Sequence, residues 1–207
     1  MRYRVESSPL IPPELQEPYS YLSTALFETR ESLHALESLY MDAGLVDLLN
    51  RIAPAFFAFV KEVLAHNIIL SIARLTDKPE IGGRENLTLS RLVLELSDQK
   101  YSELRTQLDG KCKRIEEMRD PIRLYRNKLL AHADRAECLN ANSKLGENIS
   151  IMFIRELLKE IGDFLNTFDF AFTKSETSYD EPIDTYENVT AFIDYLRKTC
   201  EGRSAAE

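Results

Sequence analysis

The segment YRNKLLAHAD, residues 125–134, carries the side chains of this chain that are best suited to chemistry on a phosphate. Arg126 offers a planar guanidinium that can bind two phosphate oxygens and stabilise charge that develops on phosphorus. Asn127 can orient a phosphate or an imidazole without adding charge. Histidine is the side chain that ionises near neutral pH, so His132 can act as a general base or a general acid. We therefore predict Arg126, Asn127 and His132 as catalytic residues.

Positive charge is concentrated around this segment. The whole chain has a formal net charge of −8, which taken alone argues against a nucleic-acid partner. Residues 98–135 nevertheless have a net charge of +3, and the rest of the chain has −11. Arg123 and Lys128 lie in this basic segment on either side of Arg126, and we predict them as RNA-binding residues.

A second set of polar residues interrupts the very apolar segment that precedes the motif. Asn67 and Arg74 are seven residues apart and Asp77 follows three residues later, so a helix would place all three on one face. Polar groups on such an apolar helix need partners, which the motif helix could supply, for example an arginine for Asp77. We predict these residues as a supporting shell of the site; the alternative is that they line an ordinary solvent-exposed edge.

The run RNKLLAH, residues 126–132, resembles the signature of HEPN domains, which is an arginine, a polar residue and then a histidine after a short gap. The wider sequence is similar to the abortive-infection branch of these proteins, in the runs ILSIARLTDKP and GRENLTLSRL and then RNKLLAHAD. The resemblance covers residues 57–134 and a helix that follows them.

This resemblance implies a helical bundle that forms a homodimer, with the two motif helices facing each other across a cleft. Catalytic members of the family are metal-independent ribonucleases in which the 2′-OH of RNA attacks the adjacent phosphate. The expected partners are RNA, a second copy of the chain and a cognate antitoxin protein, with a role in phage defence or as a toxin. We expect no cofactor and no metal.

The spacing of Arg126 and His132 bears on the dimer. On a regular α-helix, six residues leave the two side chains roughly 120° apart. Either the helix ends near Ala131, or the site combines residues of two chains; we take the second explanation as the prediction.

Two other interpretations remain open for the same residues. The fold could bind RNA, a nucleotide or a protein without turnover, and the acidity of the chain favours this because RNA enzymes usually have a broader basic face. The motif could also belong to a plain helical scaffold, in which His132 satisfies the last carbonyls of a helix.

Hydrophobic spacing predicts the elements that position the motif. The segment 45–77 is so apolar that we expect it to form the most buried helix. A helix that carries the motif is expected to begin at Asp120 and Pro121 and to stop near Asp134. Thr88 or Asn86 and Ser150 are predicted N-caps. The other predicted helices cover residues 14–40, 99–118, 151–172 and 189–200.

These elements predict an all-α, HEPN-like helical bundle of four or five main helices plus short helices. We expect an extended lead-in over residues 1–13, a single helical domain over 14–202 and a disordered tail over 203–207. Three widely spaced cysteines and the lack of a signal-peptide or membrane-spanning pattern indicate a cytoplasmic protein.

Overall fold

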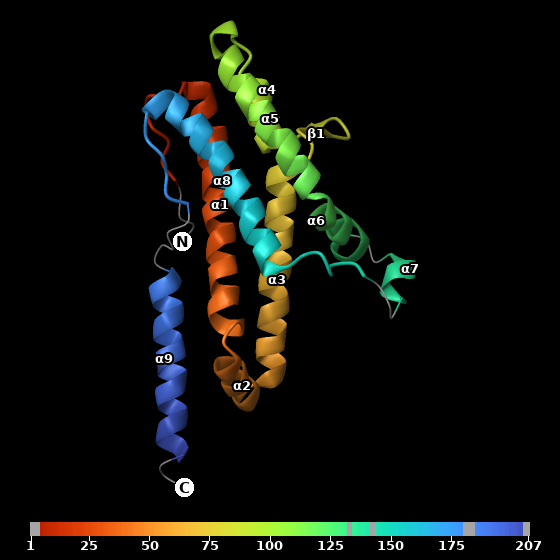
Figure 1. Cartoon of the computed structure of the whole chain (residues 1–207), viewed down its shortest axis with the longest axis vertical. Coiled ribbons are helices and arrows are strands. Elements are labelled where there is room, and N and C mark those ends of the chain that lie inside the picture. Colours follow the sequence, from red (N-terminus) through yellow and green to blue (C-terminus); the bar gives the residue numbers. More distant parts are fainter. Residues whose placement is uncertain (1–4, 132–133, 141–143, 180–184, 205–207) are drawn as a thin grey trace. The chain divides into compact units, whose positions relative to one another are not determined.

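The computed structural model of the chain is almost entirely helical (Figure 1). It describes residues 5–131, 134–140, 144–179 and 185–204. Five long helices dominate this part of the chain, which confirms the predicted all-α class and its number of main helices. They are α1 (Pro13–Tyr40), α3 (Pro54–Thr76), α5 (Ser102–Met118), α8 (Ile151–Thr173) and α9 (Thr185–Ser204).

Shorter elements connect these helices. They are α2 (Ala43–Ile52), α4 (Leu89–Glu95), the 3₁₀ turn η1 (Gln99–Tyr101), α6 (Asp120–Tyr125), the π-helical turn η2 (Arg126–Leu130) and α7 (Arg135–Cys138). The predicted N-caps are confirmed at Thr88 and Ser150, whose hydroxyls accept hydrogen bonds from the backbone N–H groups of Arg91 and Phe153. Each cap satisfies a donor that the first turn of a helix would otherwise leave unpaired.

The chain divides into two compact units, each of which is described by itself. Unit 1 comprises Met1–Glu28 and Ile69–Tyr179, and unit 2 comprises Thr29–Ile68 and Asp180–Glu207. Helices α1 and α3 are therefore each divided between the two units. The single domain over residues 14–202 stays a prediction.

The core of unit 1 is organised around α8. Helix α5 packs against α8, and α4 packs against α5 (Figure 1). The ring of Tyr19 on α1 stacks on Phe168 with centroids 5.2 Å apart. Burial of each large apolar side chain here contributes about 1.5–3 kcal/mol. The fully buried side chains of α8 are Leu157, Leu158, Ile161, Phe164, Leu165 and Phe168.

Unit 2 has its own small core, in which α2 follows the end of α1 and leads into α3 (Figure 1). Phe57 of α3 and Ile193 of α9 are buried there together with side chains of α1 and α2. The Tyr40 hydroxyl donates to the carbonyl oxygen of Phe57 at 2.6 Å. The other buried members are Leu39, Leu45, Leu48 and Leu49.

Several boundaries differ from the predictions. A two-residue strand pair, β1 (Glu80–Ile81) and β2 (Arg84–Glu85), forms in the connection between α3 and α4, where no strand was predicted. Gly82 and Gly83 make the turn between these strands with φ of +59° and +76°, a conformation that glycine adopts without strain. Helix α7 lies between the predicted motif helix and the predicted helix 151–172, where no helix was expected, and α9 extends to Ser204, two residues into the predicted tail.

Helix α3 is far more exposed than its composition led us to expect. Among the described helices it is the one that is long and apolar enough to cross a membrane by length and composition, and only 22% of its most apolar stretch is buried. The prediction that it is the most buried helix is therefore wrong. Hydropathy measures how unfavourable it is to expose a side chain to water, and it does not show whether the fold buries that side chain.

Candidate functional site

The motif lies where a regular helix gives way to a wider turn in unit 1. Helix α6 is anchored by Ile122, which is fully buried, and it continues directly into the π-turn η2. In this turn the N–H of Ala131 donates to the carbonyl of Arg126 at 2.8 Å, five residues earlier. The N–H of Asp134 then donates to the carbonyl of Lys128 at 3.0 Å and closes the turn. Single π-turns of this kind are frequent at functional sites.

This geometry corrects the argument from helical spacing. The helix ends at Leu130, and a π-turn does not advance by the 100° per residue of an α-helix. The separation between Arg126 and His132 on an ideal helix therefore gives no reason to require two chains. His132 itself lies outside the described residues.

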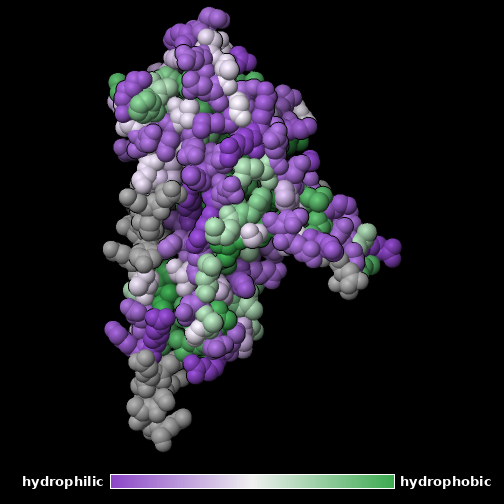
Figure 2. All heavy atoms as spheres, viewed as in Figure 1, coloured by the Kyte–Doolittle hydropathy of each residue, from purple (hydrophilic) through white to green (hydrophobic). Residues whose placement is uncertain are grey.

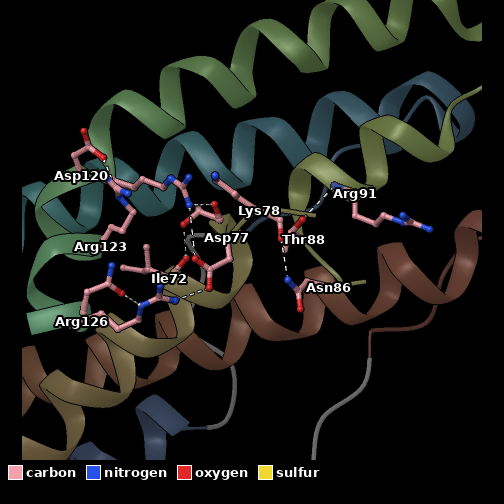
Figure 3. A network of polar contacts seen from close by, with 12 residues as sticks. Ile72, Asp77, Lys78, Asn86, Thr88, Arg91, Asp120, Arg123 and Arg126 are labelled. Atoms are coloured by element: carbon pink, nitrogen blue, oxygen red, sulfur yellow. Dashed lines mark hydrogen bonds and ion pairs between the residues drawn. The ribbon is translucent and has the colours of Figure 1, made fainter. Parts of the chain in front are cut away.

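Arg126 is held by two neighbours. Its Nη1 donates to Oδ2 of Asp77 at 2.5 Å, and its Nε donates to Oδ1 of Asn127 at 3.0 Å. The side chains of Arg126 and Asp77 are each about one-fifth exposed, and Figure 3 shows them pointing toward each other. Among the described residues, no hydrogen bond engages Nη2 of Arg126. The expected pairing of Asp77 with a motif arginine is therefore present.

Arg119 is a second arginine at Asp77. Its Nη1 donates to the carbonyl oxygen of Thr76 and lies 4.0 Å from Oδ1 of Asp77. The side chain is only 11% exposed, which indicates a structural role rather than direct contact with RNA. The Asp77 carboxylate thus lies between two guanidinium groups. Arg119 was not among the predicted site residues, and its position seven residues before Arg126 is the signal that could have identified it.

The two predicted RNA-binding cations have different surroundings. Arg123 is half exposed and pairs with Asp120 on its own helix at 3.2 Å, directed away from Asp77 (Figure 3). Lys128 donates to Oδ2 of Asp134 at 2.6 Å. This hydrogen bond raises the pKa of the Lys128 ammonium and, with backbone donors of α7, lowers the pKa of the Asp134 carboxyl. Lys128 therefore links the π-turn to α7, and Arg123 is the cation more accessible to solvent.

Two members of the predicted supporting shell have other surroundings. Asn67 lies in unit 2 and donates to the hydroxyl of Ser32 at 3.1 Å. Arg74 lies on the wall of a unit 1 cavity of about 360 Å³ beside residues of α1. The motif helix is thus not the hydrogen-bond partner of Asn67, and of the three predicted residues Asp77 is the one bonded to the motif.

In the part of the chain that the structure describes, no group of three or more His, Cys, Asp or Glu side chains is placed to hold a metal ion. The described side chains of the site are the Arg126 guanidinium, the Asn127 amide that accepts a hydrogen bond from it and the Asp77 carboxylate that pairs with it.

Comparison with known proteins bears on this site. The sequence profile of the family described as AbiU2, a HEPN family, matches residues 14–192, which include the motif, Asp77 and Arg119. Neither the comparison with curated proteins nor the comparison with solved structures gave a match.

Proposed function

Because the chain belongs to the AbiU2 family of HEPN domains, we propose that it is a metal-independent endoribonuclease that cuts RNA at a site shared by two copies. Its role would be in phage defence or as a toxin, which a cognate antitoxin protein would restrain. One observation carries the proposal beyond family membership. Arg126 begins the run that resembles the HEPN signature, and Asp77 and Asn127 hold its guanidinium in place.

The proposed reaction needs no group beyond the side chains, the RNA and water. The 2′-oxygen attacks the adjacent phosphorus and gives up its proton to a base, and the bond from phosphorus to the 5′-oxygen breaks. The leaving 5′-oxygen takes a proton, so the products are a 2′,3′-cyclic phosphate and a 5′-hydroxyl. His132 of one copy would serve as the base or as the acid beside Arg126 of the other copy, and the second proton transfer would take place with water.

Arg126 would stabilise the charge that develops on the phosphate oxygens. A guanidinium held in this way fits the task because its remaining donors are already oriented before the reaction begins. Asn127 accepts from Arg126 Nε and would retain its amide N–H groups for the phosphate or the imidazole.

The purified full chain is therefore expected to cleave single-stranded RNA in the presence of EDTA. Mass spectrometry of the fragments should find 2′,3′-cyclic phosphate and 5′-hydroxyl ends. His132→Ala should abolish the cleavage. The proposal would be contradicted by fragments with other end groups, or by cleavage that persists in His132→Ala.

A second candidate is a non-catalytic module that binds RNA or a nucleotide. Two observations favour it: the chain has a net charge of −8, and the carboxylate of Asp77 neutralises the positive charge of Arg126. Both weaken the attraction of the protein for phosphate. Intact RNA after long incubation, together with binding that weakens as salt increases, would select this candidate.

A further inference from the structure

The π-turn that carries Arg126 has little packing of its own. The structure describes all five residues of η2, and none of them is buried. Helix α6 before it has one buried residue, Ile122, which lies four residues before Arg126. Segments with few buried apolar contacts open easily. The position of the Arg126 guanidinium therefore depends on contacts that reach the turn from elsewhere in unit 1.

Tyr125 makes one such contact, with the turn that precedes α8. A Cβ atom placed on Gly146 would lie 3.1 Å from Cε2 and 3.2 Å from Cδ2 of the Tyr125 ring, whereas ordinary van der Waals contact lies at 3.4–4 Å. The ring therefore lies directly against the backbone of Gly146, with no room for a side chain between them. Figure 1 shows the segment that leads into α8 passing beside α6.

Two separate properties of position 146 require glycine. Its φ of +95° lies in the left-handed region, which residues with a side chain rarely adopt. The close approach of the Tyr125 ring is the second reason. Gly83 makes a useful comparison, because its φ is also positive, at +76°, but a Cβ atom there would meet nothing within 4 Å.

The turn around Gly146 is joined to the core of unit 1. The carbonyl oxygen of Gly146 accepts a hydrogen bond from the N–H of Ile149 at 2.9 Å. Ser150 follows and caps α8 by accepting from the N–H of Phe153 at 3.1 Å. Helix α8 then buries Leu157 completely in the core. Gly146 thus presents a supported backbone surface to the Tyr125 ring.

We propose that Tyr125 and Gly146 are positioning residues of the site. The turn before α8 supports the Tyr125 ring, and the supported ring fixes the backbone from which Arg126 reaches Asp77 and the substrate phosphate. The effect on cleavage rests on the proposed function, whereas the effect on Arg126 itself does not.

The geometry at Arg126 makes the site sensitive to this support. Tyr125 immediately precedes Arg126, whose Nη1 donates to Oδ2 of Asp77 at 2.5 Å. Hydrogen bonds weaken steeply when their distance or angle departs from the ideal. A ring that is pushed away from position 146 moves the adjacent backbone and turns the guanidinium away from the orientation that Asp77 fixes.

Gly146→Ala tests the contact through the rate of cleavage. Single-turnover cleavage of RNA should fall roughly fivefold, because a donor displaced by part of an ångström loses transition-state stabilisation. The dissociation constant for RNA should stay within about twofold, because the positive charge of Arg126 is retained. Gly83→Ala is the matched control: it introduces the same kind of backbone strain and should leave both quantities unchanged. Equal rate losses in the two variants would overturn the proposal.

Tyr125→Ala removes the ring and keeps the glycine, so it tests the same contact without backbone strain. Its single-turnover rate should also fall roughly fivefold. Gly146→Ala should cause no further loss when it is added to Tyr125→Ala, because the new methyl group has no ring to displace. Losses that multiply in the double variant would show that the two residues act separately, and would reject the positioning contact.

A measurement without RNA separates this inference from the proposed function. The Nε–H of Arg126 donates to Oδ1 of Asn127 at 3.0 Å, so its proton should give a slowly exchanging signal in a heteronuclear NMR spectrum, which Arg126→Lys would identify by its loss. In Gly146→Ala and in Tyr125→Ala this proton should exchange with water at least about threefold faster, because the hydrogen bond opens more often. Gly83→Ala should leave the exchange unchanged.

The two outcomes are distinguishable. Faster exchange in Gly146→Ala, with a wild type that leaves RNA intact, would preserve the positioning contact and reject the nuclease. Unchanged exchange in both Gly146→Ala and Tyr125→Ala would overturn the positioning contact, even if the wild type cleaves RNA.

Discussion

Replacement of Arg126 by alanine is expected to lower the rate of RNA cleavage by roughly 100- to 1,000-fold, which is the loss typical of removing one donor that stabilises transition-state charge. The fold should survive, because Asp77 keeps Arg119 within 4.0 Å. Single-turnover cleavage of a defined RNA with enzyme in excess measures the effect on the chemical step itself.

Arg123→Ala is the matched control for this prediction. Arg123 is also an arginine of the motif region, but its described partner is Asp120 on the surface of α6, so its loss should weaken RNA binding and leave the chemical step within about threefold. Equal losses of the single-turnover rate in Arg123→Ala and Arg126→Ala would show that Arg126 contributes general positive charge rather than a positioned guanidinium.

Asp77→Ala is expected to have the second-largest effect, because it acts on stability and on cleavage together. The substitution leaves Arg119 and Arg126 as two partly buried cations without the carboxylate between them. Removing one partner of a buried ion pair costs about 3–5 kcal/mol, and the one-fifth exposure of this pair reduces the expected loss to about 2 kcal/mol. Thermal unfolding should show a decrease in Tm of roughly 4–8 °C.

Cleavage by Asp77→Ala should fall by about tenfold at a temperature where the variant is folded, because Arg126 loses its fixed orientation. Asp77→Asn keeps the shape and one hydrogen-bond acceptor, so it should recover part of the Tm and part of the rate. Wild-type cleavage in Asp77→Ala, despite a lowered Tm, would assign Asp77 a purely structural role.

Local signals in the sequence were sufficient for much of the fold. Thr88 and Ser150 are N-caps because their hydroxyls can reach the free N–H groups of a first turn, and this requires only a few neighbouring residues. The pairing of Asp77 with a motif arginine was predictable for a similar reason, since a carboxylate on an apolar helix needs a polar partner.

Features that depend on tertiary contacts were not predictable in this way. Asn67 and Asp77 are both polar residues on the same predicted helix face, yet the partner of Asn67 is Ser32. Helical spacing predicts which residues share a face, but it does not predict which other residues lie against that face. The π-turn at Arg126 has no signature in the amino-acid composition. Because this turn replaces a regular α-helix, the angle between Arg126 and His132 on an ideal helix no longer argues for a dimer. The side chain of Phe59 is 62% exposed, and this was missed because a hydrophobic pattern does not show whether a side chain is buried in the fold.

The most direct test of a shared site is to mix two inactive variants. Arg126→Ala and His132→Ala should each be inactive as pure dimers. When their copies are allowed to exchange, RNA cleavage should return to about a quarter of the wild-type rate, because half of the dimers are mixed and each mixed dimer holds one complete site that combines Arg126 of one copy with His132 of the other. A mixture that stays inactive, although the wild type cleaves RNA and the variants form mixed dimers, would contradict a site built from two copies.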